Sequence, residues 1–174
     1  AGLALEDEAE LNAALLASGA PIGVMNAVRK HVSGIKGGRL AAAAHPAKVV
    51  SLIVSDVPGD DPAEVASGPT VPSAVSLAET RALIRNHGIE LPGKIAAYLA
   101  QAPDAPRPED AVFSGNEVKV IASARLSLEA AAARAEAAGI GAVILSDAIE
   151  GEARDVGLVH AAIAREVAAR GRPW

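Results

Sequence analysis

The sequence predicts an α/β fold in which helices cover a mainly parallel β-sheet. Three short runs of β-branched and aliphatic residues, 48–55, 118–122 and 142–145, have the length and composition of strands. Segments with helical periodicity separate these runs, and strands that alternate with helices favour parallel pairing. The composition, with 51% hydrophobic and 21% charged residues, argues against disorder.

Two helices are expected before the first strand. Residues 6–17 begin with three acidic side chains, which a helix dipole favours in the first turn, and Ser18-Gly19 ends the pattern. Pro21 opens the second helix at a position that tolerates proline. Its apolar stripe contains Met25, Val28 and Val32, and its polar face contains Asn26, Arg29, Lys30 and Ser33.

A glycine-containing break precedes the first strand. Gly34, Gly37 and Gly38 interrupt the helical pattern, and residues 41–44 can form a short helix. The run 48–55 is almost continuously apolar, so we expect a strand buried on both faces. Turn-forming residues fill the next segment, 56–62.

The second half of the chain alternates helices with strands. A capping box of Ser76 and Glu79 starts a helix over 76–87. Further expected elements are helices over 92–100, 125–138 and 152–169, a proline-rich connector over 103–108, and strands over 118–122 and 142–145. Three or four strands are few for a complete sheet, so we expect residues 1–174 to be one α/β domain that lacks a strand on each side.

Composition excludes several classes of protein. The chain has no cysteine, which excludes disulfides, thiolate metal sites and a cysteine nucleophile. It has neither an apolar run of membrane-spanning length nor a signal peptide, so a soluble cytoplasmic protein is expected. A net charge of −5 with one Trp, one Tyr and one Phe argues against a nucleic-acid-binding surface.

Several common catalytic motifs are absent. The sequence has no Walker-type phosphate loop, no G-x-S-x-G elbow, and no G-x-G-x-x-G after a strand, which weakens a nicotinamide dehydrogenase interpretation. The four histidines, His31, His45, His87 and His160, lack the spacing of metal ligands, which favours structural or exposed roles.

A cationic segment is the first candidate site. From Leu11 to Ser55 there is no acidic residue, whereas the segment contains Arg29, Lys30, Lys36, Arg39 and Lys48. Arginine offers a fixed fork of donors to a phosphate or carboxylate, and glycines let backbone amides approach an anion. The alternative is a basic helix end that complements the helix dipole.

An acidic loop is the second candidate site. Asp56 directly follows the expected buried strand, and in open parallel sheets this edge faces the ligand. With Asp60 and Asp61 it is typical of Mg²⁺ binding. The alternative is a polar turn in which aspartates cap the local backbone.

Two further segments are less specific. Ser67, Gly68 and Thr70 can offer hydroxyls and backbone amides, although a rigid loop explains them equally well. Residues 150–154 are better explained as the acidic first turn of the last helix. A cationic loop, a strand, an acidic loop and a Gly/Thr loop in this order favour a phosphate-handling enzyme.

Three segments resemble one enzyme family. Residues 26–40 (N-A-V-R-K-H-V-S-G-I-K-G-G-R-L) and 55–72 (S-D-V-P-G-D-D-P-A-E-V-A-S-G-P-T-V-P) are long and specific, and 150–166 is similar to a late helix of that family. The sequence resembles the class II glycerate 2-kinases, some of which carry the older label hydroxypyruvate reductase. The resemblance implies ATP-dependent phosphorylation of the C2 hydroxyl of D-glycerate, with Mg²⁺, to give 2-phosphoglycerate and ADP. It also implies a Rossmann-like three-layer α/β/α fold.

The resemblance also implies roles for individual residues. Asp56, Lys36 and Arg29 would be catalytic, with Asp56 orienting the hydroxyl as a hypothetical base. Metal binding would fall to Asp56, Asp60 and Asp61. Substrate or phosphate would contact Asn26, Arg29, Lys30, Lys36, Ser67, Gly68 and Thr70.

The chain departs from the family pattern in several places. The family's upstream G-G-G-S loop and active-site lysine are missing, as is its downstream domain with G-G-E-T-T and G-G-R-N motifs, and Ala124 stands where many members have Asn. We therefore expect an internal piece that binds MgATP weakly and does not turn over alone. The alternatives are a hydroxypyruvate reductase that uses NAD(P)H, and a non-catalytic fragment that binds a partner domain or forms a homodimer.

Overall fold

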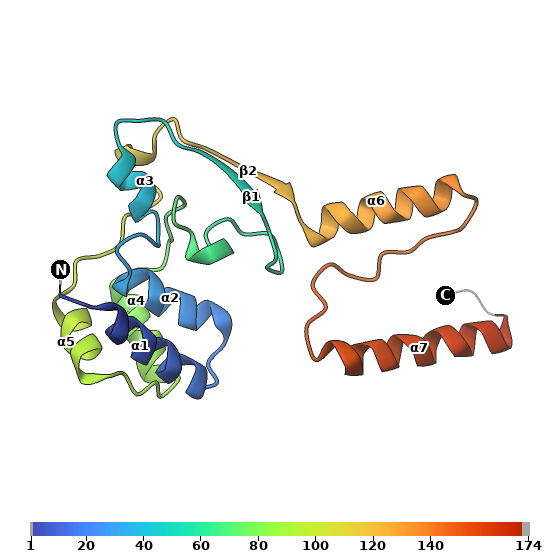
Figure 1. Cartoon of the computed structure of the whole chain (residues 1–174), viewed down its shortest axis with the longest axis horizontal. Helices are drawn as coiled ribbons and strands as arrows, with labels where there is room; N and C mark the ends of the chain where they lie inside the picture. Colours follow the sequence, from blue (N-terminus) through green and yellow to red (C-terminus); the bar gives the residue numbers. More distant parts are fainter. Residues whose placement is uncertain (1, 172–174) are drawn as a thin grey trace. The chain divides into compact units, whose positions relative to one another are not determined.

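The computed structural model describes residues 2–171, in two units that are treated separately, residues 2–127 and residues 128–171 (Figure 1). The helices of the described chain are α1 (Leu5–Ala17), α2 (Ile22–Val32), α3 (Arg39–Ala44), α4 (Leu77–Asn86), α5 (Gly93–Gln101), α6 (Ala124–Ala137) and α7 (Ala153–Arg170). The strands are β1 (Val50–Val54) and β2 (Glu117–Ala122), and short 3-10 turns are η1 (Val65–Ser67) and η2 (Ala111–Phe113). The predicted single domain over 1–174 stays a prediction, and residues 172–174 lie outside the described chain.

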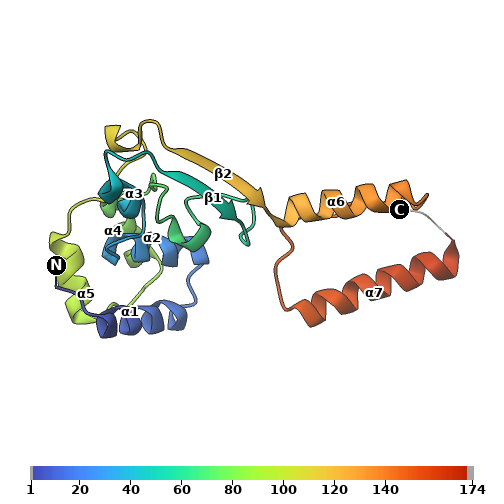
Figure 2. The same ribbon diagram turned by 45° about the horizontal axis from the view of Figure 1, so that its top comes forward.

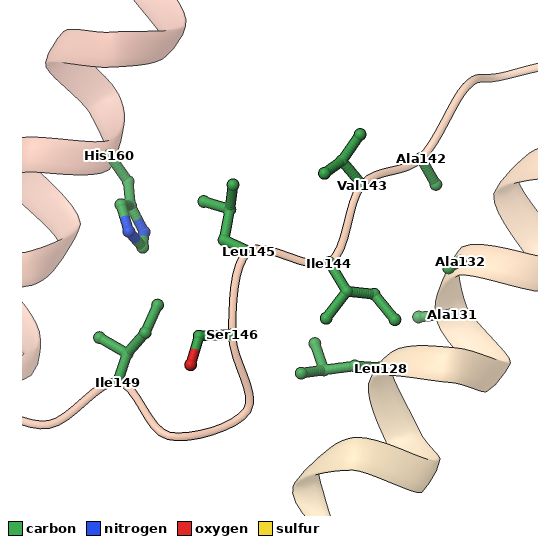
Figure 3. A pocket seen from close by; sticks show the side chains of 10 residues that line it. All are labelled: Leu128, Ala131, Ala132, Ala142, Val143, Ile144, Leu145, Ser146, Ile149 and His160. Atoms are coloured by element: carbon green, nitrogen blue, oxygen red, sulfur yellow. The ribbon is translucent and has the colours of Figure 1, made fainter. Parts of the chain in front are cut away.

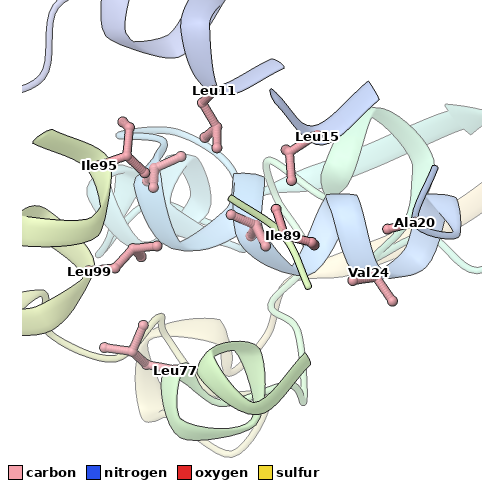
Figure 4. Close-up of a cluster of buried hydrophobic side chains, with 10 residues drawn as sticks. Leu11, Leu15, Ala20, Val24, Leu77, Ile89, Ile95 and Leu99 are labelled. Atoms are coloured by element: carbon pink, nitrogen blue, oxygen red, sulfur yellow. The ribbon is translucent and has the colours of Figure 1, made fainter. Parts of the chain in front are cut away.

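Four helices of the first unit pack around one apolar cluster. Helices α1, α2, α4 and α5 contribute its buried side chains, which Figure 4 draws in close-up. On α2, Val24, Val28 and Val32 recur every fourth residue, so they lie on one helix face and all enter the cluster. The polar residues of α2 consequently lie on its other faces, where the candidate site is built.

The sheet of the described chain consists of two parallel strands. Strand β1 pairs with β2 in the register Val50↔Glu117 to Ile53↔Val120, and the two strands run side by side in Figures 1 and 2. The α/β class and the parallel pairing are confirmed. Because the strands are parallel, their carboxyl ends lie at one edge, and the backbone amide of Ser55 there donates to Ala122 at 2.8 Å.

The prediction that the first strand is buried on both faces is wrong. Val50, Leu52 and Val54 share one face and are 55%, 63% and 65% exposed. Ser51 on the opposite face is buried, and its hydroxyl donates to Thr70. A strand is buried on both faces only where packed layers cover both, and residues 2–127 cover one.

The predicted strand over 142–145 is also wrong. In the second unit these residues form an irregular segment between α6 and α7, with Val143 and Leu145 exposed. A strand requires a neighbour that takes up its backbone hydrogen bonds, and no strand of the described chain pairs with this segment. The segment instead lines an apolar hollow of about 390 Å³ with α6 and α7 side chains, including Leu128 and His160 (Figure 3).

The helix predictions agree closely with the structure. The predicted ranges 6–17, 76–87, 125–138 and 152–169 correspond to α1, α4, α6 and α7 within two residues at each end. Ser76 and Glu79 form the expected capping box, with the Glu79 amide donating to the Ser76 hydroxyl at 3.1 Å. None of the described helices is long and apolar enough to cross a membrane.

Candidate functional site

An ion pair between a buried lysine and a partly exposed glutamate, Glu64, joins α2 to the segment that follows the acidic loop. Lys30 lies on the polar side of α2, is 1% exposed, and places its Nζ 2.6 Å from Oε1 of Glu64. Oε2 of Glu64 accepts from the Asn26 amide nitrogen at 3.0 Å. Asn26 and Lys30 are one helical turn apart, so one carboxylate bridges both side chains.

Asn26 connects this pair to two other candidate residues. Its amide oxygen accepts the hydroxyl of Ser67 at 3.2 Å and Nη1 of Arg29 at 3.2 Å. Nε of Arg29 donates to the side-chain oxygen of Asn12 on α1 at 2.8 Å. Both partners of Arg29 are neutral amides, so the guanidinium is held in place while its charge is left uncompensated by any carboxylate of the described chain.

The glycine segment is hydrogen-bonded to the Gly/Thr loop. The amides of Gly37, Gly38 and Leu40 donate to the carbonyls of Ser67, Gly68 and Pro69 at 3.1, 2.8 and 3.1 Å. These three amides are therefore not free to bind an anion, in contrast to the expectation for a glycine-rich anion loop. The backbone at Gly38 lies so close to residues 68–72 that no side chain would fit there. A Cβ at Gly38 would lie 2.9 Å from the Cα of Pro72.

Arg39 has a structural role in this segment. Its Nη1 donates to the carbonyl of Lys30, and to that of Lys36 at 3.2 Å. Burial lowers the pKa of the Arg39 guanidinium. Arg39 therefore ties the end of α2 to the glycine segment.

Lys36 and Arg29 line the same small hollow. It lies between α1 and α2, holds about 20 Å³, and is also lined by Glu8, Asn12 and Ser33. The side chain of Lys36 has no hydrogen-bond or ion-pair partner within residues 2–171. The hollow has room for about one water molecule, and the carboxylate of Glu8 faces it beside the two cations, of which Lys36 is unpartnered and Arg29 is held by amides.

The acidic loop begins at the carboxyl edge of the sheet, as the sequence predicts. Asp56 follows the end of β1 and is exposed, and Ser123 follows the end of β2 at the same edge. One oxygen of Asp61 accepts the amide of Ala63 at 2.9 Å, and Asp60 has a left-handed backbone with φ of 54°. Among the described residues no three His, Asp or Glu side chains converge as a metal site.

The donor chemistry of the acidic loop nevertheless fits Mg²⁺. This ion is commonly held by one or two carboxylates, with waters and substrate phosphates completing its octahedron. Asp56 and Asp60 have no side-chain hydrogen bond within residues 2–171, so their oxygens are available.

The structure unites some of the predicted residues and leaves others apart. Asn26, Arg29, Lys30 and Ser67 form one connected network, and Gly68 and Thr70 are tied to the glycine segment and to β1. No bond links this network to Asp56 or Asp60 in the described chain. Sequence reasoning assigned no role to Glu64, although it lies inside the motif 55–72, and none to Asn12, which lies in no quoted motif.

The comparisons with known proteins match this chain over nearly its whole length. It is 50% identical over 171 residues to an Agrobacterium vitis protein named "Putative hydroxypyruvate reductase", covering 98% of this chain and 38% of that protein. It is 41% identical over 164 residues to a glycerate kinase from Bos taurus, covering 92% and 31% of the two chains. The crystal structure of a glycerate kinase from Thermotoga maritima matches with a TM-score of 0.77 and 34% identity, covering 98% of this chain and 40% of that one.

These matches show the fold and the family. The chain spans between 31% and 40% of the length of these three proteins. The sequence resemblance to glycerate 2-kinases is confirmed, and so is the co-occurrence of the hydroxypyruvate reductase label. The description "Domain of unknown function (DUF4147)" matches residues 1–100, more than half of the chain, and the chain therefore belongs to that family.

Proposed function

We propose that this chain is part of an ATP-dependent kinase that phosphorylates the C2 hydroxyl of D-glycerate to give 2-phosphoglycerate and ADP. The observation that carries the proposal is the match to a solved glycerate kinase over 98% of the chain at a TM-score of 0.77. Exposed Asp56 at the carboxyl edge of the sheet, and the cations Arg29 and Lys36, are the kinds of groups that phosphoryl transfer requires.

Arg29 and Lys36 bind phosphate in this proposal. Two amide oxygens hold the guanidinium of Arg29 without neutralising it, so its orientation is fixed before a ligand arrives. Lys36 brings a mobile point charge to the same hollow. Together they stabilise the charge that builds up on the transferred phosphoryl group.

The acidic loop binds the metal and orients the acceptor. Asp56, Asp60 and Asp61 would hold part of the coordination of Mg²⁺, and the ion would neutralise negative charge on the phosphates. Asp56, exposed at the carboxyl edge, accepts a hydrogen bond from the C2 hydroxyl and takes its proton as the oxygen attacks. Ser67, Gly68 and Thr70 hold the loops in place around the proposed site, because their hydroxyls and carbonyls are bonded to α2, the glycine segment and β1.

The rest of the enzyme lies in the parts of the relatives that this chain does not match. The resemblance places a glycine-rich loop with an active-site lysine upstream and a second domain downstream. We therefore expect the 174 residues alone to bind MgATP weakly and to lack turnover.

A reductase is the second candidate, favoured by the name of the Agrobacterium vitis relative at 50% identity. It predicts oxidation of NAD(P)H by hydroxypyruvate without ATP. The kinase predicts ADP formation that depends on D-glycerate. Both assays should be run with the natural polypeptide that carries this sequence.

Replacing Asp56 tests the proposed chemistry. Asp56→Asn removes the charge from an exposed side chain without a described partner, so the fold is expected to persist. Turnover should fall by about a hundredfold or more, in line with the loss of a general base. Asp155→Asn, an exposed aspartate in α7, is the matched control and should keep wild-type turnover. Unchanged turnover in Asp56→Asn would refute its role.

A further inference from the structure

The ion pair of buried Lys30 and partly exposed Glu64 has a role that neither the motif nor the proposed chemistry assigns. We propose that it is a positioning device: it fixes the acidic loop on α2 and, through Asn26, orients Arg29, while Lys30 itself does not touch the substrate. The inference rests on the proposed phosphoryl transfer only for its effect on turnover. Its structural part stands on the contacts of four side chains.

Burial separates Lys30 from the other cations of the segment. At 1% exposure it is the largest fully buried side chain of the described residues, and its ammonium lies 2.6 Å from the carboxylate of Glu64. A buried ammonium requires its counter-charge, so Lys30 cannot leave Glu64 for a phosphate without a large desolvation cost. Lys36 and Arg29, which are partly exposed and unpaired with any described carboxylate, are free to bind the ligand.

Glu64 also sets the orientation of Asn26. A carboxylate accepts only, so Oε2 of Glu64 selects the NH₂ end of the Asn26 amide, at 3.0 Å. The oxygen end is thereby turned to Ser67 and to Nη1 of Arg29. With the charge of Glu64 removed, the amide can turn over, and its NH₂ end would then face the guanidinium as a second donor.

The same pair secures a strained loop. Ala66, Ser67 and Gly68 are three consecutive residues with positive φ, of 51°, 60° and 58°. Left-handed backbone at non-glycine residues persists only where surrounding contacts enforce it. Glu64 anchors one end of this turn to α2, and the amides of Gly37, Gly38 and Leu40 hold its carbonyls. The pair therefore couples the acidic loop to the segment that carries Lys36.

The test uses three variants of the natural polypeptide: Glu64→Gln, Lys30→Met and the double variant. Exposed Glu10→Gln on α1 is the charge-matched control. Glu64→Gln leaves Lys30 charged and unpaired, so the KM for ATP should rise at least about tenfold. Lys30→Met leaves Glu64 bonded to Asn26, so it should raise the KM for ATP less than Glu64→Gln does. In the double variant no buried charge is left unpaired, so the KM for ATP should be lower than in Glu64→Gln, but it should stay above wild type because the carboxylate that orients Asn26 is missing.

Hydrogen exchange gives a second reading that needs no turnover. In peptides that contain residues 37–40, exchange of the amides bonded to the 67–69 carbonyls should accelerate at least about fivefold in Glu64→Gln and recover in the double variant. Should Glu64→Gln fail to fold, Lys30→Met and the double variant still decide the question.

Two results would overturn the inference. One is loss of turnover in both Lys30→Met and the double variant with unchanged exchange, which would make Lys30 a ligand of the substrate. The other is a Glu64→Gln variant that matches Glu10→Gln in both readings. If the wild-type polypeptide forms no glycerate-dependent ADP, the proposed function fails, and exchange alone then decides the positioning role.

Discussion

His31 is a buried titratable side chain beside the candidate site. It is 1% exposed, and its Nε2 lies 3.2 Å from the carbonyl of Val75, which makes Nε2 the protonated nitrogen of the neutral ring. Burial lowers its pKa below 6.5 most strongly, and the charges of Arg39 and Arg107 add to this, while the Val75 carbonyl and Asp104 oppose it. The folded state therefore disfavours the imidazolium.

A pH dependence of stability follows from this shift. Below pH 6.5 the unfolded chain binds a proton at this position more readily than the folded chain does, so stability should fall as the pH decreases. The fall should end once the pH is below the folded pKa as well. His31→Gln keeps a donor for Val75 without a titrating group. The Tm of this variant should therefore vary less with pH below 6.5 than the Tm of the wild type. A His31→Gln variant whose Tm falls with decreasing pH as steeply as that of the wild type would contradict the role given to His31.

Gly68 and Gly88 form a matched pair for measuring close packing. Their φ values are +58° and +59°, but a Cβ at Gly68 would lie 2.6 Å from the carbonyl oxygens of Ala63 and Val71, whereas nothing lies within 4 Å at Gly88. Gly88→Ala should cost about 1 kcal/mol of unfolding free energy from backbone strain alone. Gly68→Ala should cost about 2–4 kcal/mol, because a steric clash is added. Denaturant titration measures the unfolding free energy of both variants. Equal losses would mean that the loop around Gly68 moves to make room for the added Cβ.

At the scale of a helix, the start of α4 depends on reciprocal hydrogen bonds. The hydroxyl of Ser76 and its backbone amide bond the carboxylate of Glu79 at 2.6 and 2.8 Å. These bonds, the hydroxyl first, hold the pKa of Glu79 below its ordinary value. The stabilisation is complete above pH 4.5 and is lost as the pH falls through the folded pKa.

Removing the Ser76 hydroxyl tests this capping box. Ser76→Ala should lower the unfolding free energy by about 1 kcal/mol at neutral pH. Exposed Ser114→Ala, whose hydroxyl has no hydrogen bond within residues 2–171, should change it little. The difference between the two variants should shrink below pH 4.5, and a constant difference would contradict the role of Glu79.

The elements could be predicted from sequence where local signals determine them. Capping residues and helical periodicity define α4 and α6 from residues close in the chain. The burial of 48–55 and the strand over 142–145 could not be predicted, because both depend on the layers and neighbouring strands that pack against them. A continuous apolar run indicates that a strand has faces to bury. It does not indicate which layers pack on those faces.

At the scale of the whole molecule, the site could be predicted only in part. The motifs identified Asn26, Arg29, Lys30 and Ser67, and the fold brings these together. They did not indicate that Lys30 is neutralised, because Glu64 is 34 residues away and no spacing rule connects the two. Nor did they indicate that the amides of Gly37 and Gly38 are already bonded to another loop.

The central claim concerns a polypeptide longer than this chain, which spans about 40% of the solved glycerate kinase it matches. The most direct measurement is phosphorus NMR of the natural polypeptide that carries this sequence, incubated with D-glycerate and MgATP. The account predicts that a 2-phosphoglycerate signal appears as ATP is converted to ADP, and that Asp56→Asn suppresses it. Unchanged ATP and no phosphorylated product, from a folded protein, would contradict the kinase assignment and with it the roles of Arg29, Lys36 and Asp56.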